Sequence, residues 1–301
     1  MAQRFSFDNA AFHFARTDGP SGFLLPFLIA YMICSAVVTA INLGVQILLF
    51  GSMSGLAEQA ASGVISPAQV GSIMAYYLLL MVVGIIFWAA FEAAVQRRYV
   101  RDAGFSIGFG ADELRLLVVG LLWFLFVIAA YIGFLIAGFI VMAPLAATNA
   151  DPGIVGLLMI LLGLVGLFVW IWLAVKLSAA GALTIRDRKI HFFSSWGATR
   201  GRFWPLFGAY LILLIIVLVV YFAVVGTLLA VVFGGGMDLT NPDTLAALGN
   251  PQTLGAMFFV FFLILTMVQA LFLYIWAGPA ALAAKTDPRG GGMPNVAEEF
   301  T

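Results

Sequence analysis

Six long apolar runs alternate with short polar segments along the chain. The runs cover residues 23–50, 70–96, 114–142, 153–183, 203–233 and 254–284. Each exceeds the roughly 20 apolar residues that cross the hydrocarbon core as a helix. Because lipid offers no partner to an exposed peptide group, a helix is the economical way for each run to span it. The pattern predicts an all-α, polytopic bundle of six transmembrane helices.

Lysine and arginine are distributed unevenly around these runs. Of the 14 basic residues, 13 lie in the N-terminal segment, after the second and fourth runs, or after the sixth. The segments 51–69, 143–152 and 234–253 contain none. Basic residues concentrate in cytoplasmic loops. We therefore expect three hairpins, each beginning and ending on the cytoplasmic side, with both termini in the cytoplasm.

The three hairpins resemble one another in sequence. Each second helix contains a tryptophan close to a distinctive residue and then ends in a basic–acidic element. In chain order these are Trp88, Glu92 and Arg101-Asp102; Trp172, Lys176 and Arg186-Asp187; Trp276, Pro279 and Lys285-Thr286-Asp287. This pattern predicts repeats over 1–102, 103–188 and 189–289, followed by a flexible tail, 290–301. The alternative is that every inward helix end needs an aromatic anchor and a charge.

The segments that lead into the odd-numbered runs mix aromatic with polar residues. They read Phe-Ser-Phe-Asp at 5–8, Phe-Ser-Ile-Gly at 105–108, and Phe-Ser-Ser-Trp-Gly at 193–197. Such segments are typical of elements lying in the membrane interface. We expect short interfacial helices before the first, third and fifth spans.

Composition limits the classes of function. Hydrophobic residues make up 63% of the chain and charged residues 9%, against about 25% charged in soluble domains. The net charge of zero argues against nucleic-acid binding driven by bulk charge. The single cysteine, Cys34, allows no disulfide within the chain and no cysteine-based zinc site. Motifs for nucleotides, metals or other cofactors are absent. We expect no cofactor, no metal and no enzyme activity.

Two charged residues lie deepest in the apolar runs. Glu92 and Lys176 occupy equivalent places in the first two hairpins. Opposite charges at similar depth favour an intramembrane ion pair. Such a pair is either a proton or substrate site, or a packing contact with Lys176 extending towards the surface.

A second group of candidates is polar or helix-breaking. Pro279 takes the third equivalent place, where a proline opens the backbone ladder and frees a carbonyl. Asn42, Gln46 and Gln269 lie within spans. These residues are candidates for ligand contact or for hydrogen bonds between helices.

Arginines on the predicted cytoplasmic side are candidates for binding lipid headgroups. They are Arg97, Arg98, Arg101, Arg186, Arg188, Arg200 and Arg202. The alternative is that they only orient the chain. Glycines 153, 156, 163 and 166 stripe the fourth run. Small residues let helices approach closely, so the stripe predicts a packing seam within one chain or a self-association surface.

One segment resembles a known pattern. Residues Phe193-Ser194-Ser195-Trp196, followed by Arg200, Phe203 and Trp204, run directly into an apolar span. This segment and the six-span layout resemble poorly characterised bacterial multipass proteins related to the membrane domain of bacterial glycerophosphodiester phosphodiesterases. The resemblance implies a bacterial cytoplasmic (inner) membrane protein in envelope or lipid homeostasis. That group's catalytic residues belong to a separate soluble domain, so none is carried over.

Three hypotheses for function follow. The leading one is a non-enzymatic membrane protein that binds lipids or other membrane proteins. The second is a small carrier, proton-coupled or passive, that uses Glu92 and Lys176. The third is a lipid-directed enzyme at the membrane surface, with candidate groups at Asp102, Asp112, Glu113, Asp187 and His191.

Overall fold

The computed structural model describes residues 5–17, 19–50, 67–148, 150–234 and 251–287. Every regular element in these ranges is helical, which confirms the predicted fold class. In chain order the elements are α1 (Phe7–Ala11), η1 (His13–Ala15), α2 (Leu24–Phe50), α4 (Pro67–Arg101), α5 (Ala111–Ala147), α6 (Pro152–Leu177), α7 (Ala180–Asp187), α8 (Ser195–Ala198), α9 (Phe203–Gly234) and α11 (Pro251–Lys285). The predicted tail, 290–301, lies outside the described residues.

Six helical stretches are long and apolar enough to cross a membrane. They are Leu24–Val45, Gly71–Arg101, Ala111–Leu145, Pro152–Asp187, Phe203–Thr227 and Phe259–Lys285. Consecutive spans contact one another as α2 with α4, α5 with α6, and α9 with α11. The predicted number of spans and their pairing into hairpins are therefore confirmed.

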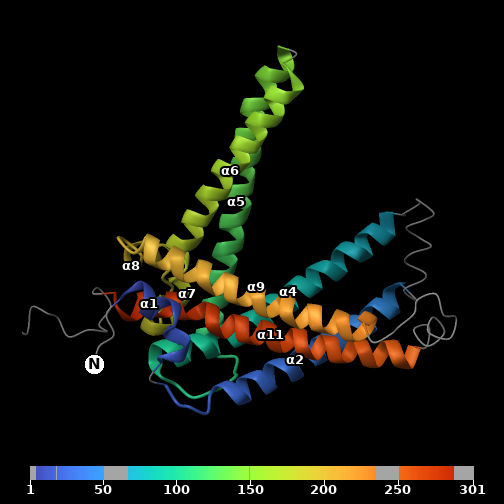
Figure 1. Cartoon of the computed structure of the whole chain (residues 1–301), viewed down its shortest axis with the longest axis vertical. Helices are drawn as coiled ribbons and strands as arrows, with labels where there is room; N and C mark the ends of the chain where they lie inside the picture. The colour runs from blue at the N-terminus through green and yellow to red at the C-terminus, as the bar shows by residue number, and fades with distance from the viewer. Residues whose placement is uncertain (1–4, 18, 51–66, 149, 235–250, 288–301) are drawn as a thin grey trace, which may run out of the picture.

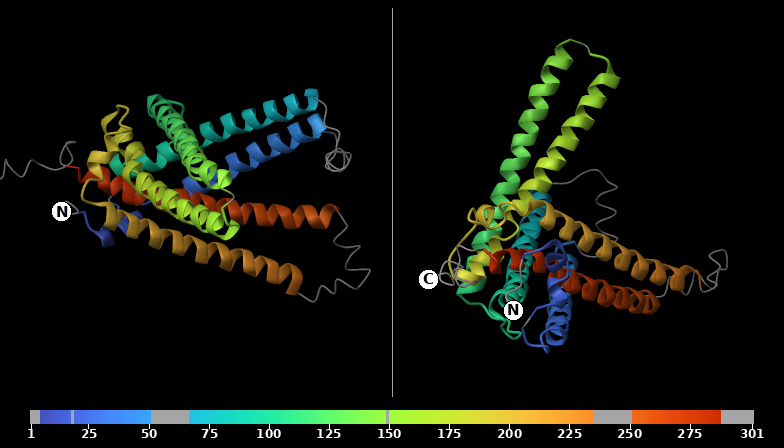
Figure 2. Two further views of the ribbon diagram at one scale, coloured as in Figure 1. Left: turned by 90° about the horizontal axis from the view of Figure 1, so that it is seen from above. Right: turned by 60° about the vertical axis from the view of Figure 1, so that its left-hand side comes forward.

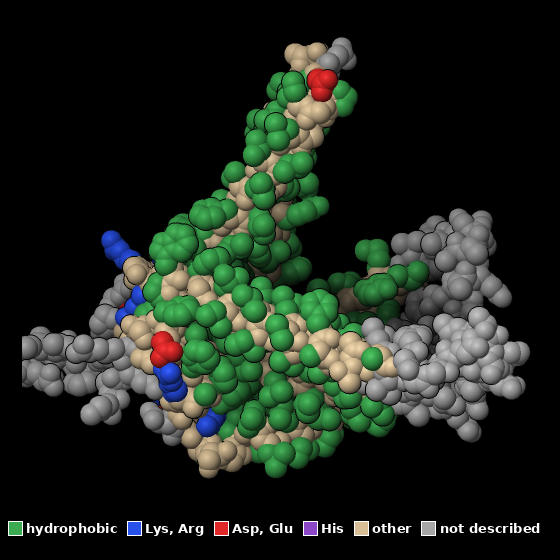
Figure 3. All heavy atoms as spheres, viewed as in Figure 1, with side chains coloured by type: hydrophobic (Ala, Val, Ile, Leu, Met, Phe, Trp, Pro, Cys, Tyr) green, Lys and Arg blue, Asp and Glu red, His purple; other side chains and the backbone are tan. Residues whose placement is uncertain are grey.

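The helices converge at one end of the molecule and diverge from it (Figures 1 and 2). We call this the charged end; it comprises residues 5–17, 19–23, 97–116, 176–206 and 277–287. Basic side chains gather there on the visible face with an acidic one beside them, whereas apolar side chains cover most of the long helices; a further acidic side chain lies at the far tip of the α5–α6 hairpin (Figure 3). The α5–α6 hairpin leaves the charged end in a different direction from the other long helices (Figure 1). The most apolar windows of α5 and α6 contain no buried residue, so their surface suits contact with lipid.

Aromatic rings fill the core near the charged end. Phe23 stacks on Phe27 at 5.5 Å between centroids, and Tyr99 stacks on Tyr274 at 5.3 Å. The Tyr99 hydroxyl donates to the Tyr274 carbonyl at 2.8 Å. Small residues of α4, including Ala89 and Ala93, are fully buried. These contacts make α4 and α11 the central helices of the fold.

The fourth span differs from the prediction of one helix over 153–183. α6 ends at Leu177, and α7 begins at Ala180 after a turn. The hydroxyls of Ser195 and Thr199 donate to the Lys176 carbonyl at 2.9 and 3.0 Å. These side chains take the carbonyl as a partner where the helix ends, and α7 turns into the core.

Short helices precede the first and fifth spans, as predicted, but not the third; their location in the membrane interface stays a prediction. α1 and η1 precede the first span, and α8 precedes the fifth. Residues 102–110, before the third span, contain no helix. Gly104, Gly108 and Gly110 lie in this stretch, and glycine is about 1 kcal/mol less favourable than alanine in a helix.

The predicted helix break at Pro279 is also wrong. α11 continues through this buried proline to Lys285. The backbone at Gly278 lies against His13 and Phe14 of the N-terminal segment. Packing on this segment holds the helix together through the proline, since neighbouring elements can stabilise a proline-containing span.

Candidate functional site

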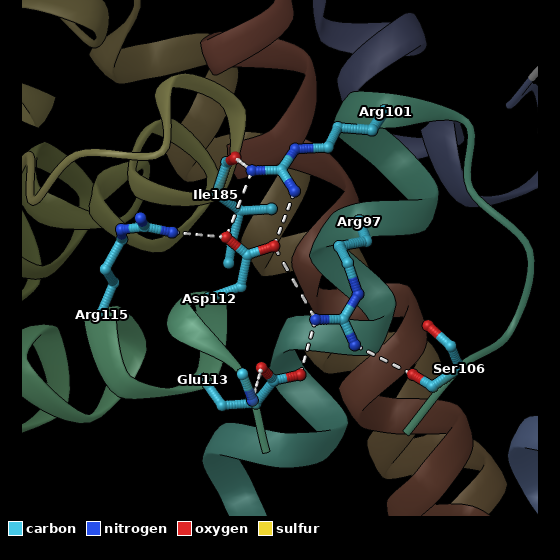
Figure 4. A network of polar contacts seen from close by, with 8 residues as sticks. Arg97, Arg101, Ser106, Asp112, Glu113, Arg115 and Ile185 are labelled. Atoms are coloured by element: carbon cyan, nitrogen blue, oxygen red, sulfur yellow. Dashed lines mark hydrogen bonds and ion pairs between the residues drawn. The ribbon is translucent and has the colours of Figure 1, made fainter. Parts of the chain in front are cut away.

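An arginine-rich pocket opens at the charged end. It has a volume of about 560 Å³. Its lining comes from the end of α4, the segment 106–111, the start of α5, and Arg188 after α7. Figure 4 shows the arginines of α4 and α5 converging on two carboxylates. The pocket therefore lies where the first two hairpins meet.

The start of α5 positions the first carboxylate. Glu113 accepts the backbone N–H of Gly110 at 2.9 Å, and so satisfies a donor at the helix N-terminus. Its other oxygen accepts from Arg97 Nη1 at 2.6 Å (Figure 4). Arg97 Nη2 donates to the Ser106 carbonyl at 2.9 Å. The side chain of Glu113 is almost fully buried, so this ion pair ties α5 to α4 and to the segment between them.

The second carboxylate holds several arginines together. Asp112 accepts from Arg101 at 2.6 Å and from Arg115 at 2.9 Å, and Arg97 lies 3.9 Å away. Arg101 also donates to the Ile185 carbonyl in α7. Three arginines thus face two carboxylates, and Arg188 adds a fourth positive charge. The pocket carries a net charge of +2.

Arg115 and Arg188 are the cations best placed to take a further anion. Arg115 contacts Asp112 through Nη1, although a guanidinium carries five N–H donors. Arg188 is exposed and forms no ion pair within the described ranges. Beside them, Ile107 and Phe109 are 40% and 66% exposed. The site offers free cationic donors next to apolar surface.

Arg188 has an unusual backbone conformation. Its φ of 55° and ψ of 30° place it in the left-handed region, directly after α7. Glycine is the usual residue at this position because other side chains are strained there. An arginine here keeps a guanidinium at the pocket despite the strain.

The other predicted headgroup arginines differ in availability. Arg98 is 6% exposed, and its guanidinium lies over the Phe23 ring at 5.2 Å. Arg186 pairs with Asp187 at 2.6 Å. Arg200 is exposed. Of the predicted set, the structure leaves Arg188 and Arg200 exposed, whereas Arg98 is enclosed in the core.

Arg202 forms hydrogen bonds to the C-terminal end of α11. It donates to the Thr286 hydroxyl and carbonyl, both at 2.8 Å, and to the Ala283 carbonyl at 3.2 Å. Burial lowers the pKa of the Arg202 guanidinium, and the charge of Asp287 opposes this change. These contacts make Arg202 a structural residue.

The structure does not bring Glu92 and Lys176 together. Glu92 accepts from Gln96 Nε2 at 2.6 Å. Lys176 Nζ donates to the Thr199 carbonyl at 3.3 Å and lies 6.0 Å from the Trp196 ring centroid. Although both side chains are described, no ion pair joins them.

The polar candidates within the spans are dispersed. The Tyr76 hydroxyl donates to Asn42 Oδ1, which joins α4 to α2. Gln269 is exposed on α11. The side chain of Gln46 lies outside the described residues. Asn42 therefore has the role of a hydrogen bond between helices, one of its two predicted roles.

The remaining surface carboxylates form separate contacts. Asp102 pairs with Lys285 at 3.0 Å. His191 Nε2 lies 3.4 Å from Asp187. In the described ranges no three histidine, cysteine or acidic side chains gather as metal ligands.

The glycine stripe of α6 divides into two parts. Gly166 packs against the Phe134 ring of α5, leaving no room for a side chain. A Cβ at Gly156 or Gly163 would meet no other atom within 4 Å, so there these glycines face open space. One part is a seam within the chain, and the predicted self-association through the stripe remains a prediction.

Sequence reasoning missed the roles of Asp112, Glu113 and Arg115 in this pocket. A partial signal was present: Glu113 stands three residues after Gly110, in the place of the glutamate of a capping box, although the first residue of that motif is normally serine or threonine. The left-handed conformation of Arg188 had no such signal, because it depends on how α7 ends.

Comparison of the chain with protein-family models, curated proteins and solved structures finds no match. The resemblance to the membrane domain of glycerophosphodiester phosphodiesterases thus gains no support. The fold defines the class of protein: an integral membrane protein with six candidate spans.

Proposed function

We propose that this protein is a non-enzymatic integral membrane protein that binds anionic phospholipid headgroups in the arginine-rich pocket. The observation that carries the proposal is the pocket's net positive charge, with free donors on Arg115 and Arg188 beside exposed Ile107 and Phe109. Arginine suits phosphate because its planar fork donates two parallel hydrogen bonds.

The location of the pocket favours a lipid over a soluble anion. The pocket lies where α4 ends and α5 begins, close to the surface of the membrane that these helices would span. A phospholipid whose phosphate is held by Arg115 and Arg188 would have its acyl chains beside the apolar surfaces of Phe109 and α5. The basic residues orient this end towards the cytoplasm, where anionic lipids are enriched. We place the protein in the bacterial cytoplasmic (inner) membrane, in lipid or envelope homeostasis.

Native mass spectrometry of the gently extracted protein tests this proposal. We expect discrete added masses that match anionic phospholipids, and fewer of them for Arg188→Gln. One cationic contact near an anionic leaflet contributes about 1 kcal/mol, equivalent to roughly a fivefold change in affinity. Arg200→Gln is the matched control, because it removes an exposed arginine outside the pocket.

The outcomes separate the alternatives. Equal lipid retention by wild type and Arg188→Gln would reject the pocket as the binding site. Bound zwitterionic lipid in place of anionic lipid would reject the charge argument. Co-purifying protein subunits at fixed stoichiometry, without lipid, would favour a scaffold function.

A further inference from the structure

Three contacts at the charged end link the three hairpins in a cycle. Arg101, in the first hairpin, donates to the Ile185 carbonyl in the second (Figure 4). Arg186, in the second hairpin, donates to the Ala284 carbonyl in the third. Lys285, in the third hairpin, donates to Asp102 in the first at 3.0 Å. The last contact returns to the hairpin from which the first began.

The donors occupy equivalent places in the sequence. Arg101, Arg186 and Lys285 are the basic members of the three basic–acidic elements that close the hairpins. Each donor contacts the neighbouring hairpin next to that hairpin's closing basic residue. Ile185 precedes Arg186, Ala284 precedes Lys285, and Asp102 follows Arg101. Unrelated helix ends would not be expected to produce the same neighbour-to-neighbour contact three times in cyclic order.

We infer that the chain consists of three hairpin repeats arranged around a pseudo-threefold axis, with their inner ends fastened by this closed ring of cationic contacts. The ring goes beyond the proposed lipid binding, because two of its three contacts lie outside the pocket. It defines the interface between repeats.

Two of the three contacts are stabilised because the acceptor lies at the C-terminal end of a helix. The last carbonyls of a helix lack partners within that helix and carry the negative end of its dipole. Ile185 and Ala284 lie in the last turns of α7 and α11. A cation from the neighbouring repeat satisfies each of these carbonyls and stabilises the dipole.

Each of the three donors also has an acidic partner, although the position of that partner differs. Arg101 and Arg186 each bind a carboxylate in addition to a carbonyl, on Asp112 and Asp187. Lys285 instead contacts the Asp102 carboxylate of the first hairpin. Beyond the ring, the long helices diverge (Figure 2). The hairpins are thus fastened to one another at the charged end, and away from it they extend in different directions.

A charge swap tests the contact that closes the ring. Asp102→Lys and Lys285→Asp are each expected to lower the thermal unfolding midpoint in detergent, measured by tryptophan fluorescence. The double variant restores the pair with its polarity reversed, so its midpoint should exceed that expected from adding the two single effects. Asp102 has a φ of 50°, and any strain on lysine there is common to the single and double variants and cancels in the comparison. Purely additive effects would overturn the ring.

Lys285→Arg tests the equivalence of the repeats, and it is conservative enough to decide the question if the swap variants fail to fold. Arginine stands at the two equivalent positions, so the repeat predicts an unfolding midpoint at or above that of wild type. The same change at exposed Lys189, outside the ring, is the control for a general effect of arginine. A lower midpoint for Lys285→Arg than for the control would overturn the equivalence.

Discussion

Replacing Arg188 with glycine should change protein stability and lipid binding in opposite directions, because it relieves backbone strain and removes a positive charge from the pocket. Arg188 is exposed and left-handed, with a φ of 55°. This conformation costs a residue other than glycine about 1–2 kcal/mol. The greater freedom of glycine in the unfolded chain offsets about 0.4–1 kcal/mol of that relief. The net gain in unfolding free energy is therefore roughly 0.5–1 kcal/mol, while the pocket loses one cation.

Arg188→Gly is thus expected to raise the thermal unfolding midpoint and to weaken retention of anionic lipid about fivefold. Tryptophan fluorescence in detergent measures the first effect, and lipid titration in nanodiscs measures the second. Arg200→Gly is the control: Arg200 is exposed but not left-handed, so glycine there should not raise the midpoint and should leave lipid retention unchanged. A lower midpoint for Arg188→Gly would refute the strain argument, and unchanged lipid retention would refute the role of the pocket.

Three further substitutions test the structure at the charged end. Tyr99→Phe removes a buried hydroxyl donor and should lower the unfolding free energy by about 0.5–1.5 kcal/mol, whereas Tyr77→Phe on the exposed face of α4 should change it little; equal effects would contradict the hydrogen bond. Glu113→Gln should lower stability by about 1.5–3 kcal/mol, because it removes the charge that pairs with Arg97, and protease resistance of the segment before α5 should fall with it. Ser195→Ala removes one of two hydroxyls that cap the end of α6 and should lower the unfolding midpoint by an amount corresponding to about 1 kcal/mol; no change would show that the second hydroxyl suffices.

The number and type of the spans could be predicted because lipid imposes a simple rule on every residue of a run. Length and apolar composition alone decide whether a helix crosses. The break between Leu177 and Ala180 does not follow from that rule, since the run 153–183 as a whole is apolar enough to be a single span despite Lys176 and Ser178. It depends on hydroxyls from Ser195 and Thr199, about 20 positions away. Contacts of this kind have no periodic signal in the sequence.

The contacts of the candidate site residues could not be predicted from the sequence either. Glu92 and Lys176 were prominent because each is a charge within an apolar run, yet depth along a helix says nothing about the direction in which a side chain points. Their partners are instead a neighbour on the same helix and a carbonyl after α8. By contrast, Arg97 and Arg101 were predicted as contacts for lipid headgroups, and the structure places them in a network with α5.

Arg101 connects the two features of the charged end. Its guanidinium binds Asp112 in the pocket and the Ile185 carbonyl in the ring. Lipid excludes charged groups from the long faces of the helices, so recognition by charge is confined to their ends. One end of one helix offers too few donors for both packing and binding. Arg101 therefore joins the interface between repeats to the pocket: the guanidinium that contacts the second hairpin at Ile185 also holds Asp112, the carboxylate that Arg115 contacts.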